Sequence, residues 1–288
     1  MKGIVLAGGK GTRLYPSTNV ISKQLLPIFD KPMIYYPIST LMLAGIRDMI
    51  IISTPEDIHN YQKLLLDGNQ WGLSFSYVTQ PKPEGIAQAF IITRHLFKNE
   101  SVCLILGDNL FYGRLDFLKK GIAENQSATV FAYEVENPED YGVVVFDKQN
   151  KPIEIIEKPK NFVSKYAIPG LYIFDSRVFD FALELKPSAR GELEITDLQR
   201  KYLAMGELNV IKIGRGIAWL DTGNPSSMLD AAMFIRAIEQ RQGRKIACLE
   251  EIALIMGYVS INEIFKWIEK MPSSNYKNYC LKIIEEFK

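Results

Sequence analysis

Short apolar runs alternate with segments of helical period through the first half of the chain. Residues 3–6 and 48–54 are rich in β-branched and other apolar side chains, which predicts two buried strands. Between them, the segment MIYYPISTLMLAG has the length of a helix and stops at Gly45, a residue type that commonly ends helices. A third apolar run, residues 101–109, ends in a polar loop. Strand, loop, helix and strand in this order predict βαβ units, hence an α/β fold with a mostly parallel sheet.

The second half of the chain changes character twice. Four short aromatic and β-branched segments predict further strands: ATVFAYEV, YGVVVFD, PIEIIEKP and GLYIFD. After about residue 230 the pattern becomes helical, and Ser260 followed three residues later by Glu263 forms a capping-box pattern. A last amphipathic segment places five residues on one stripe: Tyr276, Cys280, Ile283, Ile284 and Phe287. We therefore predict a helical C-terminal region packed onto an α/β body.

Composition narrows the class of protein. With 288 residues, 47% of them apolar, the chain can build a sizeable core without disulfides. Its net charge of +1 argues against a dedicated nucleic-acid binder. The three cysteines, Cys103, Cys248 and Cys280, have no CxxC spacing, which is typical of reduced core thiols in a cytoplasmic protein. No apolar run approaches the roughly 20 residues that span a bilayer, and the N-terminal run is too short for a signal peptide. We expect a soluble cytoplasmic protein with no membrane partner.

A glycine-rich loop directly follows the first predicted strand, with the sequence Gly8-Gly9-Lys10-Gly11-Thr12-Arg13. Glycines allow backbone N–H groups to approach an anion closely, and at the start of a helix such groups bind phosphate. Arg13 adds a planar donor suited to bidentate phosphate contact, and Lys23 offers a second cation. The loop matches neither the Walker pattern nor G-x-G-x-x-G, which speaks against a nicotinamide dehydrogenase. The alternative is a tight turn with solvated basic ends.

Two aspartates end apolar segments, Asp108 in LGDN and Asp221 in AWLDTG. Mg²⁺ prefers one or two carboxylates together with substrate phosphates, so this pair is a candidate metal site opposite the glycine loop. Each aspartate taken alone is more typical of a turn or a helix cap. Their spacing in the sequence does not show that they meet.

Two more segments carry candidate binding groups. Lys158 would place a point charge for a second phosphate and Glu157 an acceptor for hydroxyl groups, although a solvated ion pair explains them equally. Gln80 can donate to and accept from a flat heterocycle while the backbone at Gly85 approaches its edge, and the alternative is an ordinary turn before a helix. His59 and His95 stand in surface-type helical contexts, so we expect neither a zinc site nor a histidine-based triad.

Taken together, the motifs resemble those of the glucose-1-phosphate thymidylyltransferases, sugar nucleotidyltransferases that make dTDP-glucose from dTTP and glucose 1-phosphate. The resemblance covers residues 1 to about 256 and rests on these segments: GIVLAGGKGTRLYPST, SKQLLPIFDKPMIYYPISTLMLAGI, QPKPEGIAQAF, LGDN, EKP, GLYIFD, RGELEITDL and WLDTG. It implies a Rossmann-like nucleotidyltransferase fold, with a mixed, mostly parallel sheet flanked by helices and a C-terminal helical appendage. The expected division is a core over residues 1–238, with nucleotide- and sugar-binding parts, and a helical region over 239–288 that helps assemble a homotetramer.

The resemblance also implies a role for each matching residue. It assigns Mg²⁺ to Asp108 and Asp221, and it gives catalytic roles to Arg13, Lys23 and Lys158. It assigns the nucleotide to Gly8, Gly9, Gly11, Thr12, Arg13, Lys23, Gln80, Gly85 and Asp108. It assigns the sugar and its phosphate to Asn109, Gly142, Glu157, Lys158 and Tyr172. Departures from the family pattern include Pro169, in place of threonine, and Asn224-Pro225, in place of Thr-His.

Two other functions remain open at this point. The chain could use UTP with another hexose 1-phosphate, because thymine and uracil present the same pairing edge to Gln80. A non-catalytic nucleotide-sugar sensor is the second alternative, although such a protein would need neither both carboxylates nor both cations. The product of the thymidylyl reaction would enter dTDP-deoxysugar synthesis, such as the route to dTDP-rhamnose.

Overall fold

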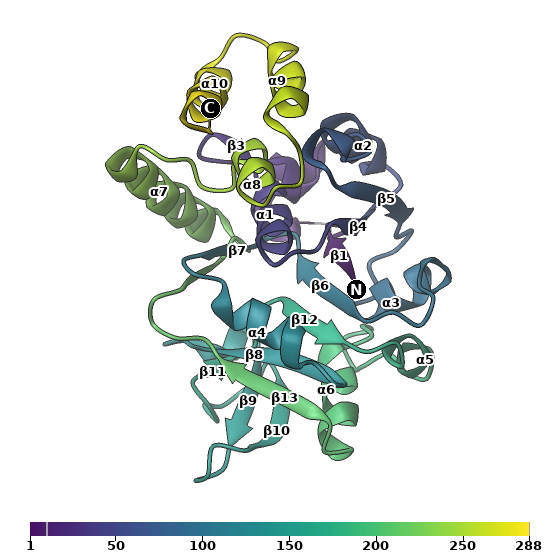
Figure 1. Ribbon diagram of the computed structural model, residues 1–288. Helices are drawn as coiled ribbons and strands as arrows, with labels where there is room; N and C mark the ends of the chain where they lie inside the picture. The colour runs from purple at the N-terminus through teal and green to yellow at the C-terminus, as the bar shows by residue number, and fades with distance from the viewer. Residues whose placement is uncertain (10, 288) are drawn as a thin grey trace.

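A ten-stranded sheet forms the centre of the computed structural model, which describes residues 1–9 and 11–287 (Figure 1). The strand order is β10-β9-β11-β8-β12-β6-β1-β4-β5, and β13 also pairs with β8. The sheet has a parallel half around β1 and a largely antiparallel half around β8. The mixed sheet with flanking helices confirms the predicted α/β class.

The parallel half contains the strands predicted from the apolar runs. β1 (Lys2–Leu6) pairs in parallel with β4 (Asp48–Ser53) and β6 (Val102–Leu106), and β5 (Ser74–Thr79) pairs with β4. Alternate side chains of β1 enter opposite cores, because successive residues of a strand point to opposite faces. Val5 packs with α1 (Tyr35–Leu43) and the C-terminal helices, whereas Ile4 packs with α3 (Gln88–Thr93). α2 (Ile58–Leu65) lies against β4 and β5.

The antiparallel half begins where β12 (Leu171–Phe174) pairs with β6 in the opposite direction. It continues through β8 (Ala128–Glu134), β9 (Gly142–Phe146) and β10 (Pro152–Glu157), which together with β12 match the four predicted aromatic segments. It also contains β11 (Tyr166–Ala167) and β13 (Leu208–Lys212), which the sequence pattern did not predict. α5 (Val178–Leu183) and α6 (Ile195–Ala204) cover one face, and α4 (Asp116–Glu124) belongs to the core on the other. Two halves of different topology therefore meet along the β6–β12 pair.

Two small elements connect the halves beside this junction. β7 (Asn109–Tyr112) pairs antiparallel with β14 (Ala218–Asp221), and β2 (Pro27–Ile28) pairs with β3 (Lys31–Pro32). The following helix, α7 (Pro225–Gln242), begins with Asn224 as its cap, which accepts a hydrogen bond from the Ser227 backbone N–H. A separate apolar cluster joins α7 to these strands through Ile28, Met33, Tyr36, Leu110, Ala231, Ile235 and Ala247.

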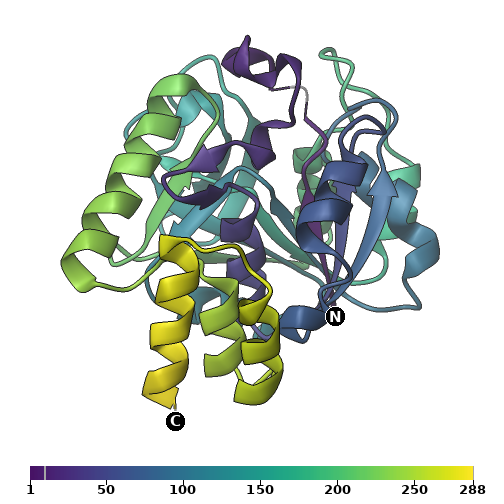
Figure 2. The same cartoon turned by 90° about the horizontal axis from the view of Figure 1, so that it is seen from above.

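The last three helices, α8 (Leu249–Ile255), α9 (Ile261–Glu269) and α10 (Asn275–Phe287), pack together beside α1 (Figures 1 and 2). The predicted capping box at Ser260 is confirmed, since its hydroxyl accepts from the Glu263 backbone N–H. Buried Glu250 accepts from Trp71 Nε1 at 2.9 Å and from the Tyr276 hydroxyl at 2.6 Å. The tail thus shares the core of the parallel half, and residues 238 and 239 both lie inside α7.

Cys103, Cys248 and Cys280 are all buried free thiols. In the described part of the chain, we find no helix with the length and apolar composition needed to cross a bilayer.

Glu239, near the end of α7, is a buried carboxylate with two donors. Its carboxylate accepts from buried Lys31 Nζ at 3.0 Å and from the Ile246 backbone N–H at 2.8 Å. Glu239→Gln removes the charge that these donors face, so we expect the free energy of unfolding to fall by about 2–3 kcal/mol. Urea denaturation measures this loss. The neighbouring Gln240→Ala, which alters an exposed side chain, is expected to change stability by less than about 0.5 kcal/mol. Equal midpoints for the two variants would contradict a stabilising role for Glu239.

Candidate functional site

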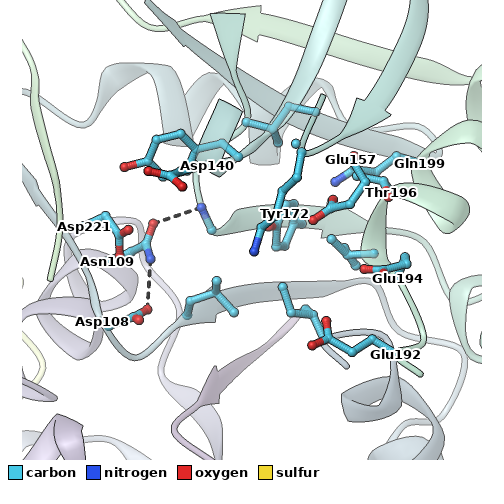
Figure 3. Close-up of a pocket in the computed structure, with 18 of the residues that line it drawn as sticks. Asp108, Asn109, Asp140, Glu157, Tyr172, Glu192, Glu194, Thr196, Gln199 and Asp221 are labelled. Carbon is cyan, nitrogen blue, oxygen red and sulfur yellow. Dashed lines mark hydrogen bonds between the residues drawn. The ribbon is translucent and has the colours of Figure 1, made fainter. Parts of the chain in front are cut away.

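A pocket of about 230 Å³ lies where the two halves of the sheet meet (Figure 3). Its walls come from strand ends of the parallel half, from β9, β10 and β12, and from the start of α6. In parallel sheets, ligands bind beyond the carboxyl ends of the strands, as the sequence pattern predicted here. Of the predicted site residues, the following line it: Arg13, Asp108, Asn109, Gly142, Glu157, Lys158, Tyr172 and Asp221.

The two aspartates come together through the pairing of β14 with β7. In this ladder Asp221 stands directly opposite Asn109, the residue after Asp108. Thr222 fixes the junction by donating from its backbone N–H and its hydroxyl to the Asp108 carbonyl, at 3.2 and 2.9 Å. The fold therefore brings together two carboxylates that are far apart in the sequence. Both aspartates line the same side of the pocket (Figure 3).

The two carboxylates have different protonation behaviour. Burial raises the pKa of Asp221 to about 6, and the negative charge of Asp108 adds to the shift. Burial opposes ionisation of Asp108 too, but the adjacent Lys23 ammonium holds the pKa of Asp108 below its usual value. Asp108 therefore carries a stable negative charge, whereas Asp221 still lacks a counter-charge sufficient to offset its burial.

Lys23 pairs with the pocket residue Asp108 through its ammonium group. It is buried, with a side chain that is 9% exposed, and it does not line the pocket itself. The structure thus pairs Lys23 with the Asp108 carboxylate. Its direct contact with phosphate stays a prediction.

Asn109 holds this region in place with three hydrogen bonds. Its side-chain oxygen accepts from the Gly170 backbone N–H at 2.9 Å and from Trp219 Nε1 at 2.7 Å. Its amide nitrogen donates to Asp108 at 3.0 Å. One side chain therefore connects β7, β14 and the start of β12, and it orients the Asp108 carboxylate.

Arg13 approaches the carboxylate pair from the glycine loop. A Cβ atom on Gly223 would stand 3.1 Å from the Arg13 guanidinium and 3.3 Å from the Asp221 carboxylate. The glycine of the WLDTG segment therefore leaves the room that Arg13 needs beside Asp221. The exposed guanidinium of Arg13 therefore lines the pocket on the same side as Asp108 and Asp221.

The glycine loop itself differs from expectation in one respect. Instead of opening an α-helix, Gly11 takes φ +57° and leads into one short 3-10 turn, Thr12–Leu14. The interpretation of the loop as a helix start is wrong, because the three residues after Gly11 close a turn on the Gly11 carbonyl instead. Lys10 lies outside the described residues. Gly8, Gly9, Gly11 and Thr12 remain beside the pocket without lining it.

Gln80 and Gly85, the pair predicted to read the base, have different surroundings. Gln80 follows β5 and is buried, and a Cβ on Gly8 would stand 2.3 Å from its side-chain oxygen. Only glycine at position 8 permits this approach. Gln80 Nε2 donates to Gln88 at 2.6 Å. Gly85 takes φ +107°, and a Cβ there would stand 2.4 Å from the Leu193 carbonyl. The structure thus places Gln80 next to the glycine loop and Gly85 against Leu193, and neither residue lines the pocket.

The opposite end of the pocket carries Glu157 and Lys158. Lys158 adopts φ +41°, a conformation that is strained for a residue with a side chain and that clusters at functional sites. Burial raises the pKa of Glu157, with a further contribution from Glu194, while Arg190 and Lys158 oppose the shift. This end therefore combines two cations with a carboxyl group that retains its proton more readily than usual.

Several lining residues were not predicted as site residues. They are Asp140, Tyr141, Arg190, Glu192, Glu194, Thr196, Gln199, Trp219, Asn224 and Ser227. The segment RGELEITDL contains four of them, and it was recognised in the sequence only through the family resemblance. The alternating charges of this segment, directly before a helix, could have indicated Arg190 as a second cation beside Lys158. In the structure, Arg190 donates to the Glu157 carboxylate at 3.2 Å.

The geometry defines a class of enzyme. An α/β sheet presents a glycine loop and an arginine at its strand ends, opposite a carboxylate pair and a second cationic end, which suits the handling of phosphate groups. The family model for nucleotidyl transferases matches residues 2–238. The chain therefore belongs to the nucleotidyl transferase family and, by the relatives below, to its glucose-1-phosphate thymidylyltransferases.

Full-length relatives support this placement. The glucose-1-phosphate thymidylyltransferase of Neisseria meningitidis is 51% identical over 288 residues, covering 99% of this chain and 100% of that protein. That of Mycobacterium tuberculosis is 49% identical over 286 residues, covering 99% of both chains. The predicted family and enzyme class are confirmed.

Solved structures agree with the sequence relatives. A Bacillus anthracis protein described as a candidate glucose-1-phosphate thymidylyltransferase, solved with sucrose, superposes with a TM-score of 0.76 and 41% identity. The alignment covers 82% of this chain and 95% of that one. A UDP-glucose pyrophosphorylase bound to UDP-glucose gives a TM-score of 0.74 at 26% identity, over 84% and 99%. The thymidylyl enzyme is thus the more similar of the two in sequence.

Proposed function

We propose that the protein transfers dTMP from dTTP to α-D-glucose 1-phosphate, giving dTDP-glucose and pyrophosphate. The proposal rests on one observation: the same pocket has Arg13 and the carboxylates of Asp108 and Asp221 at one end. Glu157 and Lys158 lie at its other end. Such a pocket offers separate sites for a nucleoside triphosphate and for a sugar phosphate. The full-length relatives named for this activity support the choice of substrates.

The reaction needs no covalent enzyme intermediate. A phosphate oxygen of glucose 1-phosphate attacks the α-phosphorus of dTTP in line, and the bond from that phosphorus to the bridging oxygen of pyrophosphate breaks. The sugar phosphate is an adequate nucleophile at neutral pH, so the main obstacle is the approach of two polyanions. Catalysis then consists of positioning and charge neutralisation.

The cations in and beside the pocket have different roles in positioning the substrates and neutralising their charge. Arg13 stabilises charge on the α-phosphate and the leaving group, and Lys158 holds the attacking phosphate against its repulsion. Lys23 keeps Asp108 ionised and oriented, and it supplies further positive charge close to the nucleotide. Arg190, which lines the sugar end, is positioned to assist Lys158 once the phosphate competes for its carboxylate partners.

The carboxylate pair fits a hard divalent cation. Lys23 offsets the charge of Asp108, but Asp221 stays hard to ionise, which indicates that the pair has room for a further positive charge. Oxygen donors of this kind suit Mg²⁺. Asp108 and Asp221 would hold it, and when bound it would neutralise and orient the triphosphate.

The base is assigned to Gln80, which lies beside Gly8 of the glycine loop, and to Gly85, which lies against Leu193. Because uracil offers Gln80 the same pairing edge as thymine, the UTP-using hexose-1-phosphate uridylyltransferase remains the second candidate function. The likeness to UDP-glucose pyrophosphorylase favours keeping it. A sensor without catalysis would not require Arg13, Lys158 and both carboxylates in one pocket.

One assay tests these functions together. Pyrophosphate release is measured with dTTP, UTP, ATP, CTP and GTP against a panel of hexose 1-phosphates, with and without Mg²⁺. Rapid release only with dTTP and glucose 1-phosphate, and only with Mg²⁺, is expected. Preference for UTP supports the second candidate, and absence of turnover with every pair contradicts both enzymatic functions.

The raised pKa of Asp221 predicts how metal dependence changes with pH. Below about pH 6 the folded protein keeps a proton on Asp221, and Mg²⁺ has to displace it. We therefore expect the Mg²⁺ concentration for half-maximal activity to rise by several fold between pH 7.5 and 5.5. Saturating Mg²⁺ should move the acid limb of the activity profile to lower pH. A requirement for Mg²⁺ that does not change over this range would contradict the assignment.

The C-terminal helices are assigned to self-association. We propose a homotetramer in the cytoplasm, with residues 1–238 as the catalytic core and 239–288 supplying contacts between subunits. Sedimentation velocity of the full chain tests the oligomeric state. The product would serve dTDP-deoxysugar synthesis such as that of dTDP-rhamnose.

A further inference from the structure

Two polar side chains of α6 enter the pocket without hydrogen-bond partners. Thr196 and Gln199 are three positions apart, so they share one face of the helix, and both line the pocket. Gln199 is 0% exposed and Thr196 is 1% exposed. Within the described residues, neither the amide oxygen nor the amide nitrogen of Gln199 finds a partner, and the Thr196 hydroxyl faces the Glu157 carboxyl group without a well-formed hydrogen bond.

This arrangement is unusual for a purely structural residue. Buried polar side chains are nearly always hydrogen bonded, because an unpaired group loses its interaction with water and gains nothing in return. Each such unsatisfied group therefore destabilises the folded protein. Gln199 leaves both ends of its amide unpaired, whereas a leucine or methionine would fill the same volume without that cost. The position therefore favours a group that is satisfied by what the pocket binds.

The surroundings of Gln199 indicate the chemistry of that ligand. Figure 3 shows Gln199, Thr196 and Glu157 together at the end of the pocket remote from Asp108 and Asp221, with Tyr172 between the two ends. At Gly142 a Cβ would stand 3.0 Å from the Thr196 methyl group and 3.3 Å from the Glu157 carboxylate. The glycine therefore keeps open the space that these side chains face.

A neutral amide suits a hydroxyl group better than a phosphate. The amide offers a donor and an acceptor, as does a hydroxyl, so one can satisfy the other. Phosphate oxygens instead prefer cations, and the pocket provides these separately as Arg13, Lys158 and Arg190. The end formed by Gln199 thus matches the hydroxyl-bearing part of a sugar rather than its phosphate.

We propose that Gln199 determines sugar specificity by hydrogen bonding to a hexose hydroxyl on the part of the ring remote from the 1-phosphate, with Thr196 beside it. The inference rests on the proposed function, because it assumes a hexose 1-phosphate in this pocket. A site built to bond a hydroxyl discriminates strongly against an analogue that lacks it, since the protein group is then left unpaired again.

The test compares Gln199→Leu with the wild-type protein on glucose 1-phosphate and on its 2-, 3-, 4- and 6-deoxy analogues. With wild type, removal of the contacted hydroxyl (at C3, C4 or C6) should lower kcat/KM by about tenfold or more. Gln199→Leu should lower kcat/KM for glucose 1-phosphate by a similar factor. It should leave kcat/KM for that deoxy analogue within about twofold of the wild-type value, and it should leave KM for dTTP unchanged.

Controls separate specificity from structure. Lys201→Gln, on the same helix but outside the pocket lining, should keep the wild-type sugar profile. Gln199→Met serves as a second apolar variant, and thermal unfolding of both Gln199 variants should match or exceed that of wild type. A variant that folds but loses activity equally on glucose and on every deoxy analogue would overturn the inference, as would an unchanged profile. If wild type uses no hexose 1-phosphate at all, the proposed function fails first, and that result is distinct.

Discussion

Asp108→Asn is expected to lower kcat by about 10²–10³-fold while leaving the fold intact. The substitution keeps the size of the side chain but removes the charge that pairs with Lys23 and that completes the carboxylate pair with Asp221. With one carboxylate fewer, the proposed Mg²⁺ site would be incomplete, and the triphosphate would lose the positive charge that the ion would supply. Pyrophosphate release at saturating substrates, repeated over a range of Mg²⁺ concentrations, measures the effect.

A matched aspartate provides the control for this variant. Asp116, at the start of α4, has a side chain that is 66% exposed, so Asp116→Asn should retain wild-type turnover. Circular dichroism and thermal unfolding establish that both variants are folded. Near-normal turnover of folded Asp108→Asn at ordinary Mg²⁺ would remove Asp108 from the mechanism.

The second large effect is expected from Arg13→Ala, with a loss of kcat of about 10²–10³-fold. The guanidinium lies beside Asp221, in the room that Gly223 leaves. In the proposed reaction, this is where charge would develop as pyrophosphate leaves. Arg13→Lys should recover only part of the activity, because an ammonium group cannot reproduce a planar bidentate contact. Rapid-quench measurement of a single turnover separates this loss from any change in product release.

Arg114→Ala is the corresponding control, since the side chain of Arg114 is 89% exposed and lies outside the pocket lining. It should leave both kcat and KM unchanged. An Arg13→Ala protein that raises KM for dTTP alone, with kcat preserved, would mean that Arg13 binds the ground state rather than the transition state.

The sequence pattern predicted the parallel half of the fold well. The strands at β1, β4 and β6 are continuous apolar runs because both of their faces are buried, and such runs are easily recognised. Local side-chain chemistry was also informative, since the capping box at Ser260 forms as expected. The arrangement of the antiparallel half was not accessible, because strand order and register depend on contacts between distant segments.

The same distinction applies to the site. Asp108, Asp221, Arg13 and Lys158 were all identified as candidates from residue types at strand ends. Their convergence was not predictable from spacing, because it depends on the pairing of β14 with β7. Residues on the buried face of α6, such as Gln199, were not predicted as site residues, because one amide on the buried face of an amphipathic helix gives no distinctive sequence pattern.

The pairing of β14 with β7 also bears on how the enzyme matures during translation. A nascent chain that has emerged only as far as α6 already carries the glycine loop, Gln80 and Asp108. It still lacks Asp221, as well as the Trp219 donor that anchors Asn109. The catalytic centre is therefore among the last parts of the core to be completed on the ribosome. Truncated genes that keep the recognisable N-terminal motif but end before residue 218 encode proteins without a complete active site.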